Sequence, residues 1–112
     1  MNLQELITKL DLTVLTQAKD FSKISPRGGY ASDLLSCVMA GAQPDNLWIT
    51  LQAHMNVIAV ASLREVSAVI ITENTQPEAD VIEKANEQGV ILLGTTEPSY
   101  QVIGKLWEMG NH

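Results

Sequence analysis

Three short segments of the chain concentrate threonine, amide and imidazole side chains, which are groups that can hydrogen-bond a small ligand. They follow Leu51, Thr72 and Gly94, and each comes after an apolar run and before a segment with helical periodicity. Unpaired backbone N–H groups at helix N-termini attract anions. The same residue types also cap helices, so a structural role is the alternative. The candidate ligand-binding residues are Thr50, His54, Asn56, Thr72, Asn74, Thr95 and Thr96.

His54 and Asn56 are the most suggestive pair in these segments. A neutral imidazole at the start of a helix can both donate and accept a hydrogen bond, so His54 could hold a ligand. The alternative is a structural histidine bonded to a neighbouring loop. Glu73 and Glu97 disfavour a multiply charged phosphate unless Arg27 or Lys23 folds over the site. We therefore expect a small metabolite or nucleotide as the ligand.

Motifs for catalysis are absent from the chain. It has no phosphate-binding loop, no dinucleotide-binding glycine pattern, no nucleophile elbow and no spacing typical of metal ligands. A triad of Ser32 or Ser36 with His54 and Asp33 can be drawn, but no spacing selects it. We expect a non-catalytic protein without a metal or cofactor. A hydrolase or transferase that depends on His54 is the alternative.

Hydrophobic patterning predicts the elements that position these groups. Continuous apolar runs of strand length predict strands buried on both faces within 47–51, 67–72 and 90–94, the first of them central. Apolar residues at helical spacing predict helices over 3–10, 34–42 and 55–63, and two more that open at Pro77 and Pro98. A β-rich run at 12–16 and a loop over 17–26 complete the chain, and Ser32 and Asp33 are expected to cap the second helix.

Strand-then-helix units in succession predict an α/β fold. We expect residues 1–112 to form a single-domain, three-layer sandwich with a mainly parallel sheet and helices on both faces. The carboxyl ends of the parallel strands then share one edge, where ligands of such folds bind. Trp48 and Trp107 are expected to be core anchors, and Cys37 to pack in the core or an interface.

Composition and charge narrow the classes of partner. The chain has 112 residues with a formal net charge of −6, which disfavours nucleic acid because phosphate backbones need a basic face. Apolar residues make up 46% of the chain and charged residues 18%, so a hydrophobic core is expected. No segment is typical of a signal peptide or a membrane span. The single cysteine fits a reducing cytoplasm.

The predicted helix over 55–63 is apolar almost all round, and Leu34, Leu35, Val38 and Met39 form another apolar stripe. These surfaces exceed what one small sheet can cover, so a homodimer is plausible. The alternative to ligand binding is therefore a homodimeric interaction module with no small-molecule ligand.

Several segments resemble the DRTGG-domain family. The resemblance rests on the run from Gly28 to Ser36, on Trp48-Ile49-Thr50, on the run from His54 to Ala61, and on Gly104-Lys105-Leu106. It extends from about Leu3 to Gly110. The five letters that name the family do not occur here, and the nearest string is Ser25-Pro26-Arg27-Gly28-Gly29.

The resemblance implies a regulatory or ligand-sensing domain that signals to a partner protein. Members of the family occur as single-domain proteins, in long phosphotransacetylases and beside CBS domains, and their fold is similar to the N-terminal domain of HPr kinase/phosphatase. The kinase relatives carry their phosphate loop in a separate domain that this chain lacks, so the resemblance implies no kinase activity. Larger members have a Gly-Asp-Arg type of turn where this chain has Gln52 to Asn56.

Overall fold

One sheet of five strands forms the middle layer of the molecule, in the order β1-β5-β4-β3-β2. The structure is a computed structural model and describes all residues from 1 to 112. Strands β2 to β5 pair in parallel, and the short β1 pairs antiparallel with β5. The strands are β1 (Thr13–Val14), β2 (Gly29–Ala31), β3 (Leu47–Thr50), β4 (Ala68–Ile71) and β5 (Leu92–Gly94).

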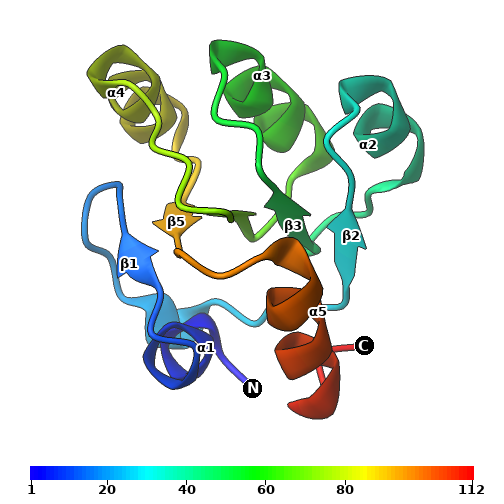
Figure 1. The fold of residues 1–112 in the computed structure, drawn as a ribbon. Helices are drawn as coiled ribbons and strands as arrows, with labels where there is room; N and C mark the ends of the chain where they lie inside the picture. The colour runs from blue at the N-terminus through cyan, green and yellow to red at the C-terminus, as the bar shows by residue number, and fades with distance from the viewer.

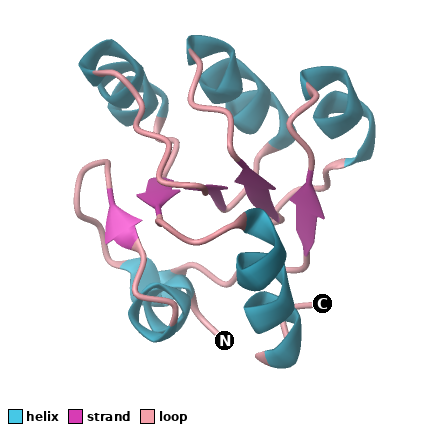
Figure 2. Cartoon of the chain, in the orientation of Figure 1, coloured by secondary structure: helices cyan, strands magenta, loops and turns pink.

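Helices cover both faces of this sheet. In Figure 1, α2, α3 and α4 lie on one face and α1 and α5 on the other, and both chain ends lie on the side of α1 and α5. Figure 2 shows the same three layers coloured by type of element. The predicted three-layer α/β sandwich with a mainly parallel sheet is therefore confirmed. The helices are α1 (Leu3–Lys9), α2 (Leu35–Gly41), α3 (Met55–Arg64), α4 (Ala79–Gln88) and α5 (Ser99–Glu108), with a 3-10 turn, η1 (Phe21–Lys23).

The strands divide the core into two apolar clusters, one on each face of the sheet. Successive side chains along a strand point to opposite faces, so Trp48 packs with α2, α3 and α4 whereas Ile49 packs with α1 and α5. In β4, Val69 and Ile70 divide in the same way, and both are fully buried. This burial on both faces explains why β3, β4 and β5 have no alternating polar residues.

Helix α1 begins at Leu3 and is capped by Asn2, whose side chain accepts a hydrogen bond from the Glu5 N–H while the Glu5 side chain accepts one from the Asn2 N–H. Helix α4 ends at Gly89, which adopts a left-handed conformation at φ 71°. A left-handed residue at this position ends a helix, and glycine adopts it without a steric penalty.

The start of α2 differs from the prediction. The helix begins at Leu35, with Leu34 in the cap position, and neither Ser32 nor Asp33 caps it from the predicted place. Residues 29–31, for which the sequence predicted no element, form the edge strand β2. As a result β3 lies beside β2, and the central strand is β4 rather than β3.

The prediction that Trp107 anchors the core was wrong. Trp48 is fully buried as expected, but Trp107 is 64% exposed, because α5 faces the sheet with Val102 and Leu106. Cys37 is exposed on α2, which excludes the core and leaves the interface as the other half of that prediction. No helix combines the length and apolarity that a membrane span requires.

Candidate functional site at the carboxyl edge of the sheet

The loops that follow β3, β4 and β5 lie along one edge of the sheet and are joined by backbone hydrogen bonds. The Thr72 N–H donates to the Thr50 carbonyl at 3.0 Å, and the Asn74 N–H donates to the Thr95 carbonyl at 3.0 Å. The Glu73 N–H donates to the Glu97 carbonyl at 2.9 Å. The parallel sheet therefore brings Thr50, Thr72 and Thr95 to a common edge, as the strand pattern predicted.

The hydroxyl groups at this edge are bonded within the protein. Thr50 is buried, and its Oγ1 donates to Asp33 Oδ1 at 2.7 Å and accepts from the Gln52 N–H. Thr72 is also buried, and its Oγ1 lies 2.6 Å from Ser99 Oγ. Thr95 Oγ1 accepts from the Glu97 N–H. Thr50 thus fixes the end of β3 to the β2–α2 connection, and Thr72 fixes the end of β4 to the start of α5. Thr95 stabilises its own loop.

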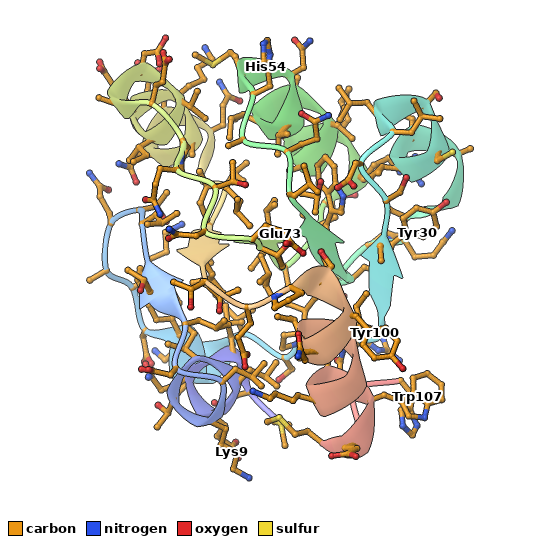
Figure 3. The ribbon with its side chains drawn as sticks, viewed as in Figure 1. Lys9, Tyr30, His54, Glu73, Tyr100 and Trp107 are labelled. Carbon is orange, nitrogen blue, oxygen red and sulfur yellow. The ribbon has the colours of Figure 1, made fainter.

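The other predicted residues lie further out. Asn74 is exposed, has φ 58° and accepts a hydrogen bond from the Gln76 side chain. His54, Asn56 and Thr96 are exposed and have no side-chain hydrogen bond within the protein. In Figure 3, His54 lies at the outer start of α3, well apart from Glu73 beside the strand ends.

A groove of about 410 Å³ opens between the first turns of α3 and α4. His54 and Gln52 line one side, and Glu78 and Asp80 line the other. The threonines of the strand ends do not line it, so the structure separates His54 from Thr72 and Thr95. The cap residues of both helices, His54 and Glu78, make no side-chain hydrogen bond to the helix start.

Charge in and around this groove is mainly negative. Glu78 and Asp80 lie at the start of α4, whereas the first turn of α3 has no acidic residue. The two other acidic residues of this edge are already engaged: Glu73 accepts from the Ser99 N–H and Glu97 pairs with Lys105 at 2.6 Å. An anionic group is therefore favoured only at the α3 side of the groove.

Asp33 lies at this edge in a structural role that the sequence did not predict. Its Oδ1 accepts from both Thr50 Oγ1 and the Leu51 N–H, at 2.7 and 2.9 Å. The carboxylate thus ties the β2–α2 connection to the end of β3, and it does not orient His54. No group of three or more His, Cys, Asp or Glu side chains is placed to hold a metal ion.

We expect Asp33→Ala to lower the free energy of unfolding by about 1–2 kcal/mol, because the buried Thr50 hydroxyl and the Leu51 N–H lose a charged acceptor. Asp33→Asn retains one acceptor oxygen and should recover about half of that loss. Urea unfolding measures both, and Asp80→Ala, an exposed residue without such bonds, is the control. Equal stability of the Asp33→Ala variant and the wild type would contradict this role.

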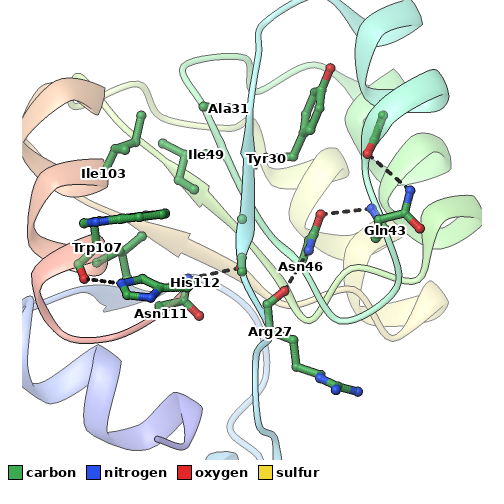
Figure 4. Close-up of a pocket in the computed structure, with 14 residues that line it drawn as sticks. Arg27, Tyr30, Ala31, Gln43, Asn46, Ile49, Ile103, Trp107, Asn111 and His112 are labelled. Carbon is green, nitrogen blue, oxygen red and sulfur yellow. Dashed lines mark hydrogen bonds between the residues drawn. The ribbon is translucent and has the colours of Figure 1, made fainter.

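A second concave region lies away from the predicted edge. It has a volume of about 530 Å³ and lies beside β2 and the C-terminal half of α5 (Figure 4). The sequence interpretation missed it because β2 was not predicted and Trp107 was assigned to the core.

Comparison with known proteins identifies the family. The model of the DRTGG domain matches residues 5–109, which is almost the whole chain. The chain belongs to the DRTGG domain family. No curated protein matches this DRTGG domain.

A solved structure shares the fold of the DRTGG domain described above. It is the crystal structure of the CBS and DRTGG domains of the regulatory region of Clostridium perfringens pyrophosphatase, complexed with the activator diadenosine tetraphosphate. The TM-score is 0.72 at 14% sequence identity, over 89% of this chain. The match spans 43% of the crystallised chain, which comprises the CBS and DRTGG domains, so this DRTGG domain corresponds to less than half of that regulatory region.

Proposed function

We propose that this DRTGG domain is a non-catalytic regulatory module that binds a small metabolite or nucleotide at the carboxyl edge of the sheet and signals to a partner protein. The observation that carries the proposal is the groove of about 410 Å³ beside His54, which has a volume typical of small-ligand sites. In support, the structurally similar pyrophosphatase region is regulatory and was crystallised with a nucleotide activator. The exposed free Cys37 is consistent with a reducing cytoplasm.

The charges of the groove narrow the ligand class. Free N–H groups at the start of α3, together with His54 and Gln52, suit a single anionic group. Glu78 and Asp80 on the opposite side suit hydroxyl or amino donors. A nucleoside monophosphate or a zwitterionic metabolite therefore fits better than a polyphosphate, whose extra charges would face these carboxylates.

The test is thermal unfolding with a panel of nucleoside mono-, di- and triphosphates, diadenosine tetraphosphate, acyl phosphates and amino acids at millimolar concentration. A ligand at 100 times its Kd stabilises the folded state by about 2.7 kcal/mol, which raises Tm by several degrees. His54→Ala should reduce this increase without changing the Tm of the free protein, because His54 is exposed. His112→Ala is the matched control.

A response to no compound in the panel would contradict the ligand-binding proposal. An increase in Tm that persists in His54→Ala but is lost in His112→Ala would show that the ligand binds elsewhere.

A homodimeric interaction module is the second candidate. Part of the predicted apolar surface is indeed exposed: Leu34 is 60% and Leu63 67% exposed, although Val57, Ile58 and Val38 are buried within the domain. We propose that Leu34 and Leu63 form part of the contact between two copies. A monomeric mass in light scattering at micromolar concentration would contradict this alternative.

A further inference from the structure

The outer edge of β2 has free hydrogen-bonding groups. On the inner side, the Gly28 carbonyl accepts from the Leu47 N–H and the Ser32 N–H donates to the Ile49 carbonyl. Because the backbone groups of neighbouring strand residues point to opposite sides, the N–H and C=O groups of Gly29 and Ala31 point away from β3. Charged residues and prolines commonly protect such edges, but residues 28–32 include neither.

A hollow flanks this edge on the face covered by α5. Gly29 and Ala31 contribute almost no side chain there, so the apolar wall of the hollow consists of Ile49, Ile103, Leu106 and Trp107 (Figure 4). Ile103 is 38% and Trp107 64% exposed. The hollow therefore has apolar walls without an apolar side chain to fill it.

On the opposite face of the strand, the ring of Tyr30 lies against Gly41. A Cβ atom built on Gly41 would come within 2.4 Å of this ring, so the glycine allows Tyr30 to pack close to α2. The volume of about 530 Å³ thus extends along both sides of the edge. Side chains of a strand added at this edge would alternate between the two sides.

Charge around the hollow differs from that of the whole chain. No Asp or Glu side chain lines it, although acidic residues outnumber basic ones by 13 to 7 in the sequence. Arg27 is the only Lys or Arg residue that lines the hollow, and in Figure 4 its side chain points away from His112 and the hollow. A carboxylate on an extended segment would pair with Arg27 only where the segment runs past the end of the hollow.

We propose that the free edge of β2 binds an extended segment of a partner protein as an added strand, with bulky apolar side chains in the hollow beside Trp107 and a carboxylate near Arg27. Backbone hydrogen bonds supply affinity in this mode, and the side-chain pockets supply specificity. This inference rests on the proposed function, because it identifies the surface to which the signalling partner would bind. Asp33 links the β2 edge to the groove beside His54, because it connects the β2–α2 segment to Leu51 at the start of the loop that contains His54.

A second copy of this chain is a poor occupant of the hollow. In an antiparallel β2–β2 pair, the residues facing the hollow would be Gly29 and Ala31 of the other copy, which are too small to fill it. The filling side chains must therefore come from a different sequence, with large apolar residues at alternate positions.

The probe is the synthetic peptide acetyl-Glu-Ile-Thr-Ile-Thr-Ile-Glu-amide, whose two acidic ends allow either strand direction. Trp107 reports binding directly, because Trp48 is already fully buried. We expect a blue shift of the tryptophan emission and amide chemical-shift changes at Gly29, Ala31 and α5. N-methylation of the peptide at alternate residues should weaken binding at least tenfold in one register and leave it unchanged in the other.

Three variants test the surface. Ala31→Pro removes an N–H group that β3 does not use, and Ile103→Glu places a charge in the hollow. Each should weaken binding at least tenfold. Gln101→Glu adds the same charge to another, exposed position of α5 and should bind as the wild type does. Circular dichroism confirms that each variant is folded.

The inference fails if millimolar peptide leaves the Trp107 emission unchanged, if both N-methylated forms bind equally, or if Gln101→Glu weakens binding as much as Ile103→Glu. A dimer in light scattering that Ala31→Pro abolishes would assign the edge to a second copy and would also overturn it. The Tm response that depends on His54 is measured without peptide. Failure at β2 and failure of the proposed ligand site are therefore distinguishable.

Discussion

Trp48→Ala is expected to lower the free energy of unfolding by about 3–5 kcal/mol, a range typical of large aromatic residues removed from a packed core. Trp48 is fully buried between β3 and the layer of α2, α3 and α4. Its Nε1–H also donates to the Ser32 carbonyl at 2.9 Å. The substitution therefore leaves a cavity and removes a bond that holds the end of β2.

Urea unfolding followed by circular dichroism measures this loss, and two variants separate its causes. Trp48→Phe retains most of the packing but leaves the Ser32 carbonyl without its donor, so an intermediate loss is expected. Trp107→Ala is the control of the same residue type, and we expect a change of about 0.5 kcal/mol or less because Trp107 is mostly exposed. Similar losses at Trp48 and Trp107 would contradict the assigned burial.

Strands β3, β4 and β5 were predictable because each is buried on both faces. Their burial leaves Thr50, at the end of β3, as the only polar residue of the three strands, so the sequence pattern is strong. The edge strand β2 has three residues, Gly29, Tyr30 and Ala31, of which none is fully buried. Its position depends on pairing with β3, and a single-sequence pattern does not contain that information.

The common edge of Thr50, Thr72 and Thr95 was also predictable, since it follows from parallel strand order alone. The partners of their hydroxyls were not. Asp33 is 17 residues from Thr50, and Ser99 is 27 residues from Thr72. Such bonds depend on the exact placement of loops, which hydrophobic periodicity does not specify.

The sequence of α5 does contain a pattern that indicates an exposed apolar face. Tyr100, Ile103 and Trp107 are spaced by three and four residues, and Val102 and Leu106 are spaced by four. A helix lying on one side of a sheet buries a single stripe. Two apolar stripes therefore imply that one faces outward, and in the structure it is the stripe with Trp107, which is 64% exposed.

Leu106→Ala is expected to lower the free energy of unfolding by about 2–5 kcal/mol and to release α5 more than the rest of the molecule. Only Val102 and Leu106 are buried on this helix. The other interactions that hold α5 are polar. The ion pair of Lys105 and Glu97 is partly exposed, and such pairs contribute little to the free energy of unfolding. Truncation of Leu106 therefore removes one of the two apolar anchors.

Native-state hydrogen exchange distinguishes release of α5 from uniform destabilisation. Amides of α5 should lose more protection than those of β3 and β4, while Glu108→Ala, at an exposed position of the same helix, should leave both unchanged. An equal loss of protection in all elements would show that α5 opens only with the whole domain. Because α5 supplies Ile103, Leu106 and Trp107 to the hollow beside β2, loss of the Leu106 side chain and release of α5 should both weaken peptide binding there. Stability of this helix and binding at the β2 edge are thus expected to fall together.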